Sequence, residues 1–235
     1  MRIVWILLFF APAGCDSRPS APSPDPSSPL RVFAASSLRE VVTAIAAEWT
    51  KRTAQRVHLQ FEASSTLARQ IREGAPSDLF ITAAPEWLDQ VKTIGRIDWL
   101  SNRLVVVVRK ETGEFDLAKA GSLALANEQV PAGKYARAAL AFLGIKAPER
   151  TIYGANVRDV LSKVSQGGAQ AGIVYATDAA IDPEVRISFT FPPESHPRIF
   201  YSLGLLAPSA KGLYDALQEP WAMAMTRKHG FSEVR

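Results

Sequence analysis

Hydrophobic residues along the chain follow two spacings, one typical of strands and one typical of helices. Short apolar or alternating runs predict strands at 30–35, 57–61, 79–82, 104–108, 123–126, 171–175, 187–191 and 199–206. Between them, apolar residues three and four positions apart predict helices, most of which end at a glycine, at 38–53, 67–72, 86–94, 135–143 and 157–166, and a last helix or pair of helices at 212–228. This alternation predicts an α/β protein with largely parallel sheets.

Ligands of parallel α/β sheets bind outside the carboxyl ends of the strands, where loops meet helix N-termini. At the first such junction, Ser37 and Glu40 lie three residues apart and predict a capping box. An ordinary helix cap is sufficient to explain this junction by itself. The second junction places three hydroxyl residues, 64–66, between a strand and a helix. One hydroxyl is enough for a cap, so three of them beside free N–H groups also suit an anion site.

Two later junctions offer backbone donors. Pro131 suits the first turn of a helix, and the small residues Ala132 and Gly133 leave the N–H groups of that turn open. Asn156 predicts an N-cap that Asp159 can close.

The residue after this cap, Val157, then presents a free N–H group in the first turn of its helix. Tyr175 ends an apolar strand among small residues, and its hydroxyl can donate a neutral hydrogen bond. Taken one at a time, these features also fit ordinary caps and a core tyrosine.

Composition and charge narrow the classes of function. The 235 residues include 47% hydrophobic and 21% charged residues, as in a soluble globular protein. The formal charge of +4 comes from dispersed residues without a basic run, which disfavours nucleic-acid binding and suits the attraction of anions.

Catalysis has little support in the sequence. Ser37 or Ser64 could serve as the nucleophile of a serine hydrolase, but the chain has no G-x-S-x-G motif and no H-E-x-x-H motif. His58, His196 and His229 lie far apart in the sequence without a supporting motif. We therefore expect a binding protein and not an enzyme, with a hydrolase as the less favoured alternative.

The N-terminal residues predict export. Residues 1–15 combine Arg2, an apolar run over 3–10 and small residues before Cys15, which indicates a signal peptide. Cys15 resembles the lipid-modified cysteine of bacterial lipoproteins, although Pro12 stands where these usually carry leucine. A plain signal peptide is the alternative. Residues 16–29 are rich in Pro and Ser and predict an extended tether.

Several segments, taken in order, resemble the molybdate-binding proteins of bacterial ABC importers. The strongest match is Ser-Ser-Thr-Leu-Ala-Arg-Gln-Ile at 64–71. The other matching segments are 74–76, 78–81, 32–35 with 37–38, 130–133, 157–158, 172–175 with 178–179, 191–196 and 230–231. Together they extend the resemblance over essentially all of residues 30–235.

The resemblance implies a two-lobed periplasmic-binding-protein fold, each lobe a mostly parallel sheet flanked by helices, with the ligand in the cleft. It implies a first lobe of residues 30–102 and 195–235 and a second lobe of residues 103–194. The implied ligand is molybdate or tungstate, delivered to an ABC permease from the periplasm or the outer face of the cytoplasmic membrane. No cofactor is implied, and a monomer is the simplest expectation.

The implied ligand contacts are the hydroxyl and N–H groups of Ser37 and Ser64, the N–H groups of Ala132 and Val157, and the hydroxyl of Tyr175. Metal would enter only as the oxyanion, through these same residues. A site of neutral donors favours a fully deprotonated oxyanion, because a protonated phosphate would also need an acceptor. Another anion, such as sulfate or a small organic anion, remains the alternative ligand.

Overall fold

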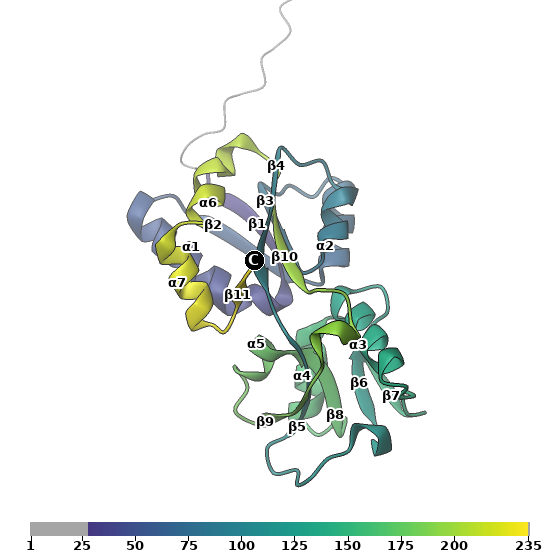
Figure 1. Ribbon diagram of the computed structural model, residues 1–235. Helices are drawn as coiled ribbons and strands as arrows, with labels where there is room; N and C mark the ends of the chain where they lie inside the picture. The colour runs from purple at the N-terminus through teal and green to yellow at the C-terminus, as the bar shows by residue number, and fades with distance from the viewer. Residues whose placement is uncertain (1–27, 235) are drawn as a thin grey trace, which may run out of the picture.

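The computed structural model describes residues 28–234. The expected signal segment 1–15, its Cys15 and most of the tether 16–29 lie outside the described residues. The described chain forms two lobes, each built on its own sheet, and passes between them twice (Figure 1).

The first lobe is a six-stranded sheet with the order β11-β4-β10-β3-β1-β2. Its strands are β1 (Leu30–Ala35), β2 (Val57–Glu62), β3 (Leu79–Thr82), β4 (Gly95–Ser101), β10 (Phe200–Leu205) and β11 (Ser232–Glu233). Strands β2, β1 and β3 pair in parallel, whereas β10, β4 and β11 join antiparallel.

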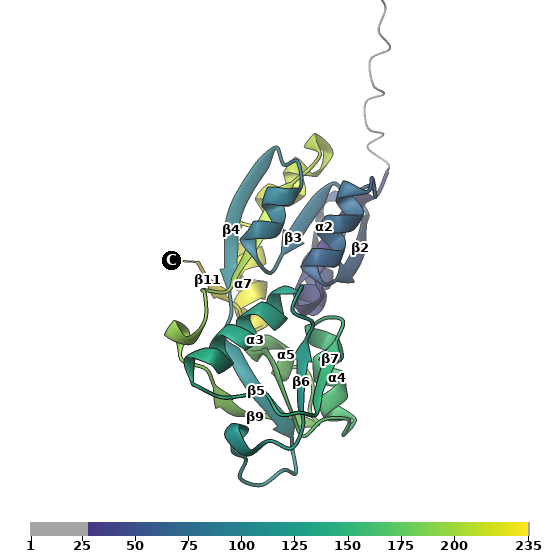
Figure 2. The same ribbon diagram turned by 90° about the vertical axis from the view of Figure 1, so that its right-hand side faces the viewer.

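Helices cover both faces of this sheet (Figures 1 and 2). They are α1 (Arg39–Thr53), α2 (Ser64–Arg72), α6 (Lys211–Ala216) and α7 (Pro220–Lys228). The alternation of side chains along β1 explains the two layers. Val32 packs in the cluster that includes Ile45 of α1, whereas Phe33 packs on the other face with Leu67 of α2.

The second lobe is a five-stranded sheet with the order β7-β6-β8-β5-β9. Its strands are β5 (Leu104–Arg109), β6 (Leu123–Ala126), β7 (Thr151–Gly154), β8 (Ala171–Tyr175) and β9 (Val185–Thr190). The helices of this lobe are α3 (Pro131–Phe142), α4 (Val157–Ser165) and α5 (Ala176–Ala179). Strands β7, β6 and β8 pair in parallel, and β5 and β9 join antiparallel.

Short 3-10 helices complete the two lobes. They are η1 (Ser36–Leu38), η2 (Pro85–Gln90), η3 (Leu117–Lys119), η4 (Pro193–Ser195) and η5 (Pro208–Ala210). The chain leaves the first sheet after β4, enters the second at β5, and returns between β9 and β10.

The two-lobed α/β class agrees with the sequence prediction, and both sheets are mixed. Each sheet keeps three parallel strands, and the strands at which the chain changes lobes pair antiparallel. The apolar runs at 104–108 and 171–175 form adjacent buried strands, as expected for central positions.

One predicted helix is wrong. Residues 86–94 form only the 3-10 helix η2, which ends at Gln90, and Gly95 begins a strand instead of ending a helix. The β-branched residues Val91, Thr93 and Ile94 disfavour continuation of a helix. Strand β4 was not predicted from the pattern either, and three further elements, β7, α5 and β11, are too brief to show a period.

Between residues 28 and 234, no helix is long and apolar enough to cross a bilayer.

Candidate functional site

A small cavity of about 20 Å³ lies where the two sets of parallel strands end. Residues directly after β1, β2 and β3 line it from the first lobe, and residues after β6 and β7 and at the end of β8 line it from the second. The cavity is therefore outside the carboxyl ends of six parallel strands, where α/β folds place ligands.

All five residues singled out from the sequence line this one cavity. Ser37 and Ser64 reach it from the first lobe, and Ala132, Val157 and Tyr175 reach it from the second. Each of these residues is at most 4% exposed, so their donor groups lie deep between the two lobes. Tertiary structure thus brings together positions from 37 to 175 of the sequence.

Tyr175 provides a hydroxyl without a partner. Its Oη atom is buried and makes no hydrogen bond to any of the described residues. The ring is held edge-on to Tyr135, with ring centroids 6.5 Å apart, and to Tyr201, at 6.1 Å. Burial raises the pKa of Tyr175 well above its ordinary value, so the hydroxyl keeps its proton and acts as a donor. A buried donor of this kind requires an acceptor in the cavity.

Ser64 is oriented by a contact within its own lobe. The N–H of Ala83, which follows β3, donates to the Ser64 Oγ atom at 2.9 Å. Because this oxygen already accepts from Ala83, its own proton is available to the cavity. Ser64 is also the first residue of α2, whose N-cap, Ala63, makes no side-chain cap. The first N–H groups of α2 therefore have no side-chain acceptor at the N-cap.

The predicted capping box of Ser37 and Glu40 is wrong. Ser37 lies inside the 3-10 helix η1, and neither η1 nor α1 has a side-chain cap. The Ser37 Oγ atom is instead 2.9 Å from the hydroxyl of Tyr201. Asn102 donates to that same tyrosine oxygen at 3.2 Å. When Tyr201 donates its proton to Ser37, the serine proton is free for the cavity.

Ala132 and Val157 offer backbone N–H groups at helix starts. In α3, the N–H groups of Gly133 and Lys134 bond the carbonyl oxygen of Val130, one turn back, both at 3.1 Å. Ala132 is the second residue of α3, after Pro131, and its N–H has no partner within the helix.

The start of α4 is arranged by the predicted N-cap. The Asn156 side chain accepts from the N–H groups of Arg158 and Asp159 at 3.0 and 3.1 Å, which leaves that of Val157 for another acceptor. Asp159 does reach back, but its carboxylate accepts from Ala155, one residue before the cap. These bonds confirm the predicted N-cap and shift the contact of Asp159 by one residue.

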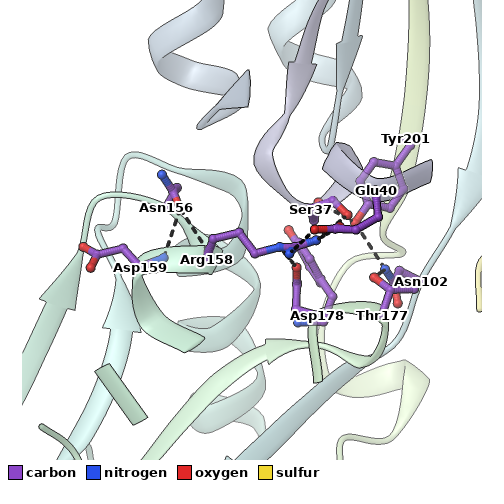
Figure 3. Close-up of polar contacts among 10 residues, drawn as sticks. Ser37, Glu40, Asn102, Asn156, Arg158, Asp159, Thr177, Asp178 and Tyr201 are labelled. Atoms are coloured by element: carbon purple, nitrogen blue, oxygen red, sulfur yellow. Dashed lines mark hydrogen bonds and ion pairs between the residues drawn. The ribbon is translucent and has the colours of Figure 1, made fainter. Parts of the chain in front are cut away.

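Carboxylates and one arginine surround the cavity without filling it. Glu62, at the end of β2, is the charged side chain among the residues that line the cavity, and Asn156 of the other lobe donates to it at 3.4 Å. Arg158 does not line the cavity. Figure 3 shows its guanidinium between Glu40 of the first lobe and Asp178 of the second. None of the described residues that line the cavity is a cation, and the helix N-termini there offer partial positive charge to an anion.

Further contacts hold the lobes together around the cavity. The Tyr135 hydroxyl donates to the carbonyl of Ala83 at 3.3 Å, and Lys134 pairs with Glu86 at 3.3 Å. Asn102, where the chain crosses between lobes, donates to Thr177 at 2.8 Å. The described conformation is thus a closed one.

A metal bound directly by side chains has no support in this geometry. No group of three or more His, Cys, Asp or Glu residues within 28–234 is arranged to hold a metal ion. The donors at the cavity are hydroxyl and N–H groups, which suit the oxygen atoms of an anion.

Comparison with known proteins agrees with this arrangement. Residues 30–232 match the family model described as "Bacterial extracellular solute-binding protein". The chain belongs to this family. A solute-binding protein and not an enzyme was the expectation, and the family confirms it.

Two curated relatives resemble this solute-binding protein over most of its length. It is 35% identical to the molybdate-binding protein ModA of Escherichia coli (strain K12), over 86% of this chain and 88% of the relative. It is 32% identical to a putative ABC transporter substrate-binding lipoprotein, YvgL, of Bacillus subtilis (strain 168), over 98% and 96%.

Two solved structures share the fold. The periplasmic molybdate-binding protein of Azotobacter vinelandii superposes with a TM-score of 0.75 at 21% identity, over 88% of this chain and all of that one. The sulfate-binding protein SubI of Mycobacterium tuberculosis gives 0.74 at 16% identity, over 88% and 87%. At these identities the likeness concerns the fold, so the choice of anion has to come from the site.

Several residues of the site were missed by reasoning from sequence. Tyr201 and Ala83, which orient the two serines, lie far from them in sequence and gave no local signal. Glu40 was assigned to a cap because spacing alone cannot distinguish a residue that reaches back along its helix from one that reaches across a cleft. Pairing of Arg158 with Glu40 spans 118 residues of sequence.

Proposed function

We propose that this solute-binding protein captures molybdate or tungstate and delivers it to an ABC importer. The observation that carries the proposal is the buried hydroxyl of Tyr175, which has no partner among the described residues and lies at the cavity between the lobes, lined by other donors. Ser37, Ser64, Ala132 and Val157 would complete the shell of donors. An anion that accepts hydrogen bonds from both lobes would hold the lobes closed by its greater affinity for the closed state.

The size and chemistry of the cavity narrow the ligand class. A volume of about 20 Å³ is close to the smallest space that holds one water, which disfavours a bulky organic anion; a tetrahedral oxyanion would require the lobes to move slightly apart. A shell of donors suits an ion without a proton. Sulfate has the same charge and shape as molybdate and is smaller, so its exclusion has to depend on the spacing of the donors across the cavity.

The names of relatives support molybdate over sulfate. The curated relative at 35% identity is named for molybdate, whereas the sulfate-binding structure shares only 16% of its residues. Two oxyanions as similar as molybdate and tungstate would occupy the same donors.

Delivery to a permease and attachment to a membrane are parts of the same proposal. The relative named as a lipoprotein supports acylation of Cys15, which would tether a monomeric carrier at the outer face of the cytoplasmic membrane. Mass spectrometry of the protein from a membrane fraction tests this directly, because acylation adds lipid mass at Cys15 and a plain signal peptide leaves none.

Isothermal titration of the purified protein with molybdate, tungstate, sulfate and phosphate tests the function. We expect one-to-one binding of the first two and at least a hundredfold weaker binding of the others. Tight binding of sulfate, or no heat with any of the four, would contradict the proposal.

The variant Tyr175→Phe tests the role of the Tyr175 hydroxyl, on which the proposed function depends. We expect about a 10- to 100-fold loss of affinity, since a hydrogen bond to a charged group is worth about 1.5–3 kcal/mol. Thermal stability without ligand should not fall, because the hydroxyl has no partner among the described residues. The matched control is Tyr153→Phe, which removes an exposed hydroxyl of the same lobe and should bind as the wild type does.

A further inference from the structure

Three charged side chains link the two lobes directly beside the proposed anion site. The Arg158 guanidinium donates to both carboxylate oxygens of Glu40, through Nη1 at 2.9 Å and through Nη2. On its other edge, the Nε atom lies 2.6 Å from the Oδ1 atom of Asp178, in a poor alignment for a hydrogen bond. Figure 3 shows that Arg158 extends from α4 across the gap between lobes to reach Glu40 on α1.

This triad adjoins three of the five proposed ligand contacts. Arg158 follows Val157 in the chain, and its Nη2 atom also donates to the carbonyl oxygen of Ser37 at 3.3 Å. Asp178 accepts the N–H of Tyr175 at 3.2 Å. The triad of Glu40, Arg158 and Asp178 is therefore linked to the backbone of ligand contacts in both lobes, although none of the three side chains lines the cavity.

The partners of Arg158 differ in how they are held. Asp178 is fully buried and belongs to the same lobe as Arg158, so this pair persists when the lobes separate. Glu40 belongs to the other lobe, and its side chain is 36% exposed. Of the contacts that Arg158 makes with Asp178, Glu40 and Ser37, opening of the cleft breaks those with Glu40 and Ser37.

We propose that Arg158 and Glu40 form an inter-lobe latch that slows release of the bound anion, with Asp178 as the anchor that keeps Arg158 in position. Glu40 is a positioning residue in this scheme, because it acts on the anion only by holding the closed state. The inference rests on the proposed function, which supplies the ligand. It adds Glu40 as a residue that affects binding without contacting the anion.

The sign of the effect separates this role from simple electrostatics. Glu40 carries a negative charge near the site of a dianion, so if repulsion alone mattered, its removal would tighten binding. A latch predicts the opposite. The favourable position of Glu40 in the first turn of α1 is the same in the open and closed states, so it cancels from the release rate.

The test compares Glu40→Gln and Glu40→Ala with the matched control Glu48→Gln. Glu48 lies on the same helix and pairs at 2.7 Å with Arg52, within one lobe. Titration calorimetry gives the molybdate affinity and stopped-flow intrinsic fluorescence gives the association rate, and the product of the dissociation constant and this rate is the release rate. We expect release to be about tenfold faster in Glu40→Ala, less so in Glu40→Gln, and unchanged in Glu48→Gln, with similar association rates.

The outcomes distinguish this inference from the proposed function. If the wild type binds molybdate and both Glu40 variants release it at the wild-type rate, or bind it more tightly, the latch is overturned and the function stands. If the wild type binds none of the four anions, the function fails.

A second measurement tests the latch without any ligand. Fluorescent labels at the exposed positions 73 of the first lobe and 146 of the second, in a Cys15→Ser background, report the distance between lobes in single molecules. We expect Glu40→Ala to lower the fraction of closed molecules several-fold relative to Glu48→Gln. Equal closed fractions in the two variants would overturn the latch whatever the ligand proves to be.

Discussion

The two lobes contribute different kinds of hydrogen-bond donor to the cavity. Besides backbone N–H groups, the first lobe contributes the side-chain hydroxyls of Ser37 and Ser64, which are oriented by Tyr201 on β10 and by Ala83 directly after β3. The second lobe contributes backbone N–H groups at the starts of α3 and α4 together with one phenol. Side-chain donors depend on the identity of the residue, whereas backbone donors depend on where the fold places a helix start.

This difference decides which substitutions should matter. In the first lobe, removal of the oxygen atom from a serine removes its hydroxyl donor and leaves only its N–H group. In the second lobe, Ala132 and Val157 can change side chain and still keep the N–H group. Their donors are vulnerable instead to changes in neighbouring residues that position the helix.

The largest effect on stability and affinity is expected for a substitution at Gly133, which lies in the first turn of α3. A Cβ atom at this position would lie 2.0 Å from the carbonyl oxygen of Asn127 and 2.5 Å from that of Ala126, and backbone atoms cannot move aside cheaply. We expect Gly133→Ala to lower the free energy of unfolding by on the order of 3 kcal/mol.

We also expect the protein that remains folded to lose most of its anion affinity, because the N–H of Ala132 is displaced. Urea unfolding and calorimetry measure both effects. The control is Gly113→Ala, where nothing lies within 4 Å of the added atom. Wild-type affinity in Gly133→Ala would show that the second lobe does not depend on this helix start.

A smaller effect is expected at Ser64 in the first lobe. Ser64→Ala removes a proposed donor and also leaves the buried N–H of Ala83 without its acceptor. We expect a loss of about 1–3 kcal/mol of stability and at least tenfold in affinity. Ser65→Ala, the next residue, is the control and should change neither quantity. Equal affinities of Ser64→Ala and Ser65→Ala would show that the first lobe does not depend on the Ser64 hydroxyl, and the distinction between the two lobes would fail.

The smallest effect is expected at Asp178, the buried carboxylate of the second lobe that pairs with Arg158. Burial raises the pKa of Asp178 to about 6, against the opposing influence of Arg158. The folded state therefore holds this proton more tightly than the unfolded state, and the stability that it contributes is lost as the pH rises from about 4 through about 6.

Asp178→Asn removes this titration, because the amide resembles the neutral acid. We expect the unfolding free energy of the wild type, minus that of the variant, to fall by up to about 2 kcal/mol between pH 4 and pH 7. Urea unfolding at several pH values measures the difference. A difference that stayed constant or rose would show that the pKa of Asp178 is not raised in the folded protein.

Much of the architecture followed from local pattern. The buried strands at 79–82, 104–108 and 171–175 could be predicted because a short apolar run bounded by polar or small residues is typical of a buried strand. Residues 86–94 were misassigned because the prediction relied on the helical spacing of apolar residues. The β-branched residues after Gln90 disfavour a helix more strongly than this short pattern favours one. The cap at Asn156 was predicted because capping depends only on residues within one turn.

The sequence by itself determined the donor types, the strand ends on which they lie and the family to which they belong. These features are local, and each was read from a few adjacent residues. Tertiary structure decided which partners orient those donors, through contacts such as that of Ser37 with Tyr201, 164 residues apart. It also turned Glu40 from an apparent cap into a contact between lobes. The physical reason is that a side chain bonds whichever partner the folded chain brings within reach, and spacing along one helix says nothing about a residue on the opposite lobe.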